Sequence, residues 1–191
     1  MTAGNRLHLV RHPATPSTRR AAFPDDEPLD ERGLREARRL SRELRRAATV
    51  FTSPSLRARQ TVAAAGSSAE IDERLSECDF GSWRGLTLQE VHDRYPDGLK
   101  VWFEDLAAAP HGGESLAAMV TRVQHFLSSC EALGGVTVAV THGGPIKAAV
   151  VLALGAPLES LWRVEVSPAT TTELARTDRG WSLTRLNRGV D

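Results

Sequence analysis

The most constraining feature of this chain is an uninterrupted β-favouring run at residues 136–141, VTVAVT, followed at once by a tight turn and an apolar helix. The turn reads His142-Gly143-Gly144-Pro145, and the helix is expected over 146–154. A strand without polar alternation is typical of sheets that are covered by helices on both faces. The unit therefore predicts an α/β protein in which this strand is buried.

Strands and helices alternate along the rest of the chain. Further strands are expected at 6–11 and 50–53, and segments 163–166, 170–174 and 181–186 are expected to form an edge or hairpin around a turn at 178–180. Helices are expected at 31–47, 54–65, 87–95 and 115–133, with a loop at 13–29. This order predicts a three-layer α/β/α sandwich with a mostly parallel mixed sheet flanked by helices. A length of 191 residues, with no repeat or linker, predicts one domain over residues 1–191.

Charge and hydropathy narrow the possible partners. Lys plus Arg equals Asp plus Glu at 24 each, which argues against a broad nucleic-acid-binding surface. The arginines of the 31–47 helix alternate with glutamates, as in Glu31 and Arg35, so this helix is expected to present a solvated, ion-paired face. No apolar run reaches the roughly 18 to 20 residues that span a bilayer, and the N-terminus lacks a signal-peptide pattern. No membrane partner and a cytoplasmic location are therefore expected.

The two cysteines, Cys78 and Cys130, have no close Cys or His companions in the sequence. Neither a disulfide framework nor a zinc site is indicated, and both thiols are expected to be reduced. A homo-oligomer is compatible with the sequence, which does not determine the oligomeric state.

Cationic side chains follow three of the predicted strands. Arg11 and His12 stand at the end of strand 6–11, His142 follows strand 136–141, and Arg57 lies in the first turn of the helix after strand 50–53. Because ligands of open α/β sheets bind beyond the carboxyl ends of the strands, all four side chains could reach one crevice. Four positive charges at one place would repel one another unless an anion binds between them. Phosphate suits such a site, because the geometry of a guanidinium group matches the phosphate oxygens.

Five segments resemble, in family order, the signatures of the histidine phosphatase superfamily, the phosphoglycerate-mutase-like proteins. They are LVRHPAT at 9–15, TSPSLRARQT at 52–61, RLSECDFGSWRG at 74–85, HGGES at 111–115 and VTHGG at 140–144. The resemblance implies that His12 is a nucleophile that becomes a phosphohistidine and that Glu77 is the general acid and base. It further implies that His142 takes part in catalysis. The residues that it implies for phosphate binding are Arg11, Arg57, Thr18 and Gly143.

One position departs from the family pattern at the centre of the chemistry. Pro13 stands where the family has glycine after the histidine, so the chain lacks that backbone N–H and has a fixed φ there. Some family members assigned to α-ribazole phosphate hydrolysis look similar at this proline, which is a hint about the substrate.

The favoured function is a metal-independent phosphomonoesterase without a cofactor, acting on a small cytoplasmic phosphate ester. One alternative is a phosphoglycerate-type mutase, against which the short chain argues, because mutases of the family tend to carry extra segments that shield the site. A second alternative is a non-catalytic phosphate-binding module, suggested by Pro13. Glu77 and His142 argue against it, because a mere binder needs neither.

Overall fold

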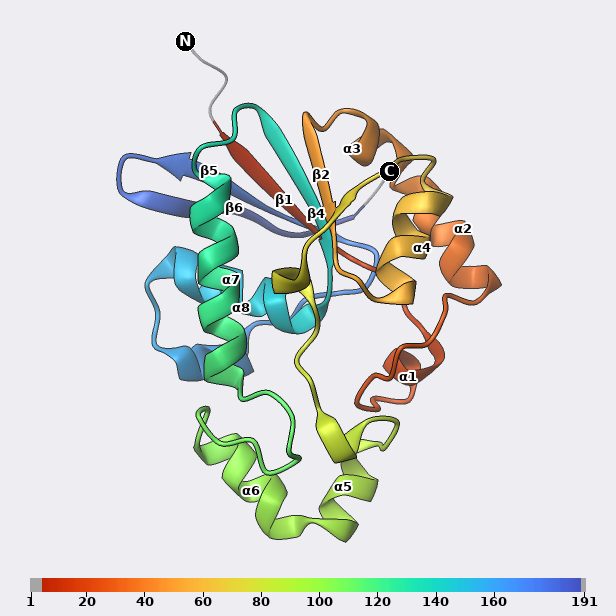
Figure 1. Ribbon diagram of the computed structural model, residues 1–191, viewed down its shortest axis with the longest axis vertical. Helices are drawn as coiled ribbons and strands as arrows, with labels where there is room; N and C mark the ends of the chain where they lie inside the picture. Colours follow the sequence, from red (N-terminus) through yellow and green to blue (C-terminus); the bar gives the residue numbers. More distant parts are fainter. Residues whose placement is uncertain (1–4, 190–191) are drawn as a thin grey trace.

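A computed structural model describes residues 5–189, and its centre is a six-stranded sheet in the order β3-β2-β4-β1-β5-β6 (Figure 1). The first four of these strands run parallel, and β5 and β6 form an antiparallel edge. Their bounds are β1 Arg6–Arg11, β2 Thr49–Thr52, β3 Glu70–Ile71, β4 Val136–Thr141, β5 Thr171–Thr177 and β6 Gly180–Arg188.

Helices cover both faces of the sheet, as the buried run at 136–141 predicts. Successive side chains of a strand point to opposite faces. Val138 and Val140 of β4 therefore pack in one core with the helices α3 (Ser41–Arg45) and α4 (Leu56–Ala64). The helix α2 (Glu31–Arg39) lies against α4. Ala139 belongs to the core on the other side, with α7 (Leu116–Cys130) and α8 (Gly143–Leu154). The predicted three-layer α/β/α sandwich with a mixed, mostly parallel sheet is confirmed.

Several shorter elements lie beyond the carboxyl ends of the parallel strands. Figure 1 shows α5 (Leu88–Arg94) and α6 (Pro96–Glu104) at the lower end of the molecule, with α1 (Pro16–Arg19) beside them. The 3-10 turns are η1 (Glu73–Leu75), η2 (Gly81–Trp83) and η3 (Leu158–Arg163). These short elements therefore lie at the end of the sheet where the site is predicted.

Capping residues in the sequence predicted where two of the helices begin. Asp30 caps α2 by accepting from the Gly33 N–H at 2.8 Å, and Thr87 and Glu90 form a reciprocal capping box on α5. The predicted pair of Glu31 and Arg35 is present at 3.8 Å on the exposed face of α2. These bonds join residues three or four positions apart, which is why the sequence alone reveals them.

Other boundaries differ from the predictions. The 31–47 helix is split at Leu40 into α2 and α3, and α8 begins at Gly143 instead of residue 146. The segment expected as a strand at 163–166 is not one, because Arg163 ends η3 and residues 164–166 have no regular structure. Two helices begin at prolines: α1 interrupts the expected loop at 13–29, and α6 starts at Pro96. Proline favours the first turn of a helix because the missing N–H has no intrahelical partner there.

Both cysteines are buried and free. Among residues 5–189 no helix is long and apolar enough to cross a membrane.

Candidate active site

The register of the parallel strands brings the predicted cations to one level. Arg11 at the end of β1 lies opposite Thr141 of β4, and Thr52 of β2 lies opposite Val140. The pairing continues one residue further, because the His12 N–H donates to Thr141 O at 3.1 Å and the Ser53 N–H donates to Val140 O at 2.9 Å. The residues that follow these strands therefore meet at the carboxyl edge of the sheet, as predicted.

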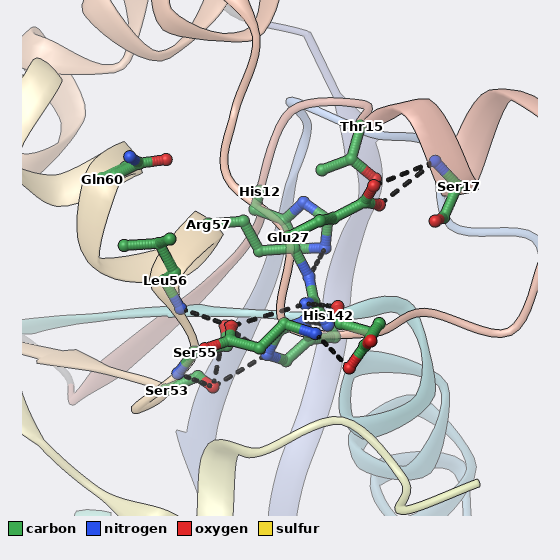
Figure 2. A network of polar contacts seen from close by, with 12 residues as sticks. His12, Thr15, Ser17, Glu27, Ser53, Ser55, Leu56, Arg57, Gln60 and His142 are labelled. Carbon is green, nitrogen blue, oxygen red and sulfur yellow. Dashed lines mark hydrogen bonds and ion pairs between the residues drawn. The ribbon is translucent and has the colours of Figure 1, made fainter. Parts of the chain in front are cut away.

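Arg57 bridges the two histidines of this edge (Figure 2). Its Nε donates to His12 Nε2 at 3.1 Å, and its Nη2 lies 3.1 Å from His142 Nδ1. The remaining nitrogen, Nη1, donates to the backbone oxygen of Asp25 at 2.8 Å. Because the imidazole centroids are only 5.0 Å apart and both rings are buried, the three side chains form one compact cluster.

These contacts determine which imidazole nitrogens carry protons. His12 Nδ1 lies 2.7 Å from the Pro13 carbonyl, which can only accept, so Nδ1 donates and Nε2 keeps its lone pair for Arg57. His142 Nδ1 likewise accepts from Arg57, so its Nε2 donates to Ser53 Oγ at 2.8 Å. Pro13 therefore orients His12 through its carbonyl group, for which its missing N–H is irrelevant.

Burial keeps both imidazoles neutral. Desolvation, followed by the charge of Arg57, lowers the pKa of His12 from its ordinary 6.5 to about 3. Desolvation and the neighbouring His12 and Arg57 place the pKa of His142 well below its ordinary value. Around neutral pH the positive charge of the cluster therefore comes from Arg11 and Arg57 alone, because His12 and His142 are neutral.

Arg11 lies on the other side of the cluster, against the start of α8. Its Nη1 donates to Val166 O, and its Nε is buried without a partner among the described residues. Gly143 packs on this guanidinium, since a Cβ there would come within 3.4 Å of Arg11 Cζ. Desolvation lowers the pKa of Arg11, against the opposing effect of Glu77 and Glu165.

The Glu77 carboxylate sits at the N-terminus of α8. One oxygen accepts from the Cys78 N–H at 3.0 Å, and the other accepts from the Gly144 N–H at 3.3 Å. Gly144 makes this position possible, because a Cβ there would lie only 2.2 Å from Glu77 Oε1. The carboxylate thus lies beside the arginine and imidazole cluster, as an acid for this site should.

Among the described residues, Thr18 makes no hydrogen bond to the cluster side chains. Its hydroxyl lies 3.0 Å from that of Thr15, and its backbone N–H bonds to the Thr15 hydroxyl, so it belongs to the cap of α1. Sequence reasoning missed Ser53 and Ser55, whose hydroxyls contact His142 Nε2 at 2.8 and 3.3 Å. Their position directly after β2, level with the histidine after β4, was the available signal.

A hydrophobic cleft adjoins the cluster. It has a volume of about 230 Å³, and the charged side chains in its lining are Arg11, Glu77, Lys147 and Glu165. Within residues 5–189 no group of three or more His, Cys, Asp or Glu side chains is arranged to hold a metal ion.

The fold, the paired histidines and the arginines define a phosphate-handling α/β enzyme, and comparison with known proteins gives its family. A family model of the histidine phosphatase superfamily (branch 1) matches residues 7–189, so the chain belongs to this superfamily. The resemblance seen in the five sequence segments is thus confirmed.

Named relatives narrow the class of enzyme. Phosphoserine phosphatase 1 of Hydrogenobacter thermophilus is 29% identical over 198 residues, covering 95% of this chain and 92% of that protein. The glucosyl-3-phosphoglycerate phosphatase of Mycolicibacterium vanbaalenii is 31% identical over 176 residues, covering 83% and 78%. A mycobacterial glucosyl-3-phosphoglycerate phosphatase solved with VO3 superposes with a TM-score of 0.82 at 26% identity, over 97% of this chain and all of that one. The chain is a phosphoric monoester hydrolase of the histidine phosphatase type.

Proposed function

We propose that the protein is a metal-independent phosphomonoesterase that hydrolyses a small cytoplasmic phosphate ester through a phosphohistidine at His12. The observation that carries this proposal is the state of His12. Its Nδ1 is tied to the Pro13 carbonyl, its Nε2 has a lone pair beside Arg57, and burial holds its pKa near 3. A neutral imidazole with one oriented lone pair is a nucleophile at physiological pH.

In the first step His12 Nε2 attacks phosphorus, forming an N–P bond while the P–O bond to the alcohol breaks. Arg57 gives up its hydrogen bond to His12 Nε2 and donates to a phosphoryl oxygen instead. Arg11 donates to a second phosphoryl oxygen through its Nε, which has no partner among the described residues. Both guanidinium groups are largely withdrawn from water, where positive charge stabilises the transferring group most. His142 joins them once the dianionic ester favours a proton on its Nδ1.

Glu77 serves both steps. In the first step it gives its proton to the departing alkoxide. In the second step Glu77 takes a proton from water, the water oxygen attacks phosphorus, and the N–P bond breaks. Inorganic phosphate leaves, and both His12 and Glu77 return to their starting states.

The mutase and the binding module are less well supported. Two relatives that align over most of the chain, at 29% and 31% identity, are named phosphatases, which favours transfer of the phosphoryl group to water. A phosphate-binding module needs no carboxylate, yet Gly144 leaves room for Glu77 beside the cationic cluster. The family match over residues 7–189 also supports our prediction of a single domain.

The test is steady-state hydrolysis of a panel of phosphate esters in the presence of EDTA. The wild-type protein should release phosphate, and His12→Ala should lower the rate by at least about a thousandfold, because the nucleophile is lost. Trapping with a ³²P-labelled ester should give protein label that is acid-labile and absent from His12→Ala. A chelator-sensitive wild type or an active His12→Ala variant would contradict the mechanism, and conversion of 3-phosphoglycerate to 2-phosphoglycerate would favour the mutase.

A further inference from the structure

Two cavities meet at Glu77, and their chemistry differs. The first is the cleft of about 230 Å³, lined largely by apolar side chains: Phe80, Trp102, Leu116, Met119, Leu161 and Trp162. The second, of about 330 Å³, is lined mainly by polar and charged groups, including Arg57, Ser53, Asp25, Asp26 and Asp79. The leaving alcohol must lie beside Glu77, so one of these cavities receives it. The charged side chains of the first cavity balance, with Arg11 and Lys147 against Glu77 and Glu165. In the second, four carboxylates, Asp25, Asp26, Glu77 and Asp79, outnumber the two arginines Arg57 and Arg84. An anionic or apolar alcohol therefore suits the first cavity better.

Two indole rings line the first cleft. Trp102 comes from α6 and Trp162 from η3, and their ring centroids are 4.9 Å apart in an edge-to-face arrangement. Trp102 is buried, whereas 38% of Trp162 is exposed. An indole that lines a cleft with part of its surface uncovered offers a face for stacking a planar group.

Lys147 adds a positive charge. It lies on α8 one turn beyond Gly143 and Gly144, is half-buried, and lines the cleft. Within residues 5–189 no carboxylate lies within ion-pair distance of its ammonium group. An ammonium group beside apolar walls binds an anionic group more strongly than it would in water.

We propose that this cleft holds the leaving group and selects a phosphate monoester whose alcohol combines an aromatic or heteroaromatic ring with an anionic group. The ring stacks on Trp162, and the anionic group pairs with Lys147. This inference rests on the proposed phosphatase function and adds to it the class of substrate.

The test uses three synthetic esters of primary alcohols: ethyl phosphate, benzyl phosphate and 4-carboxybenzyl phosphate. Their alcohols differ in shape and charge more than in basicity, so kcat/KM ratios report recognition of the alcohol. The wild type should prefer benzyl over ethyl phosphate by about tenfold and 4-carboxybenzyl over benzyl phosphate by a further tenfold or so.

Two variants separate the ring from the charge. Trp162→Ala should lower the benzyl-to-ethyl ratio by about tenfold, and Trp162→Phe should restore most of it. Lys147→Met should lower the carboxybenzyl-to-benzyl ratio by about tenfold. Lys100→Met is the matched control, because Lys100 is the other lysine of the chain and lies exposed on α6, and it should change neither ratio.

Equal kcat/KM values for the three esters, or ratios that Trp162→Ala and Lys147→Met leave unchanged, would overturn the inference while leaving a working phosphatase. Failure of the proposed function has a different signature. In that case none of the esters is hydrolysed, or the His12→Ala variant hydrolyses them as the wild type does.

Discussion

The strand β1 carries a histidine and arginine cluster at its carboxyl end and another further back along the strand, and the two clusters are partnered differently. At the carboxyl end, the partners of Arg57 are two neutral imidazole nitrogens and the Asp25 carbonyl, and the Asp26 carboxylate lies 4.0 Å away with 61% of its side chain exposed. Further back, His8 contacts the Glu43 carboxylate, and Arg188 contacts both Glu43, at 2.6 Å, and Glu173. We call these the phosphate clamp (Arg11, His12, Arg57 and His142) and the carboxylate network (His8, Glu43, Glu173 and Arg188).

The difference separates two uses of the same residue types. In the carboxylate network each positive charge is compensated inside the protein, and the bonds join α3 to β5 and β6. In the phosphate clamp, neutral groups occupy the guanidinium donors, so the positive charge stays available to an anion. Removing a cation should therefore reduce activity at one cluster and stability at the other.

The largest effect is expected for Arg57→Met. In the proposed mechanism this buried guanidinium stabilises the transferring phosphoryl group, so kcat/KM should fall by about a thousandfold. The free energy of unfolding of Arg57→Met should change less than that of Arg188→Met, because the ion pair it breaks is the 4.0 Å pair with Asp26, whose side chain is 61% exposed. Measurement of kcat/KM beside urea unfolding checks both parts. A variant that lost stability but kept its activity would contradict the assignment of the clamp.

Glu77→Gln separates proton transfer from charge stabilisation within the clamp region. The amide keeps the shape of the side chain but has no proton to give, so hydrolysis of an alkyl phosphate should slow by about a hundredfold or more. Hydrolysis of 4-nitrophenyl phosphate should slow far less, because its leaving group needs no proton. Gly144→Ala should show the same selective loss, since a Cβ there displaces the Glu77 carboxylate. Equal losses on both esters would rule out the acid role.

The two clusters should also lose stability in different pH ranges. His12 has a folded pKa of about 3 against an ordinary 6.5, so between these values only the unfolded chain takes up its proton, and stability falls as the pH falls. The slope is about 1.4 kcal/mol per pH unit for one histidine. Contact with His8 lowers the pKa of Glu43 from 4.5 to about 2, so its contribution is present above pH 4.5 and is lost towards pH 2.

Urea unfolding between pH 7 and 5 tests this difference. His12→Asn should make the dependence of stability on pH less steep in that range by the contribution of one histidine, with that of His142 remaining. Glu43→Gln should leave the slope unchanged. An equally steep slope in His12→Asn would show that His12 is not held neutral in the folded protein.

The smallest effect is expected for Arg188→Met in the carboxylate network. Glu43 and Glu173 would lose a shared partner in a largely buried setting, so the free energy of unfolding should fall by about 2 kcal/mol. The value of kcat/KM at a temperature where the variant is folded should match the wild type. Arg35→Met, which removes a pair on the exposed face of α2, is the control and should cost less than about 0.5 kcal/mol.

The sequence by itself determined the features that depend on near neighbours. The run at 136–141 predicts a buried strand, the capping residues mark helix ends, and parallel strands place Arg11, His12 and His142 at one edge wherever the sheet forms. The five segments identify the family and name Glu77. These predictions succeed because backbone preference, strand alternation and hydrogen bonds three or four residues apart are local.

Tertiary structure alone decided the states and surroundings of those residues. The neutrality of His12 and His142 depends on burial by distant segments, and Arg57 reaches His142 across 85 positions of sequence. Glu43 and Arg188 meet across 145 positions, and the aromatic cleft forms where α6 meets η3. Desolvation and side-chain packing are sums over whatever neighbours the fold supplies, so they exist only once the chain is folded.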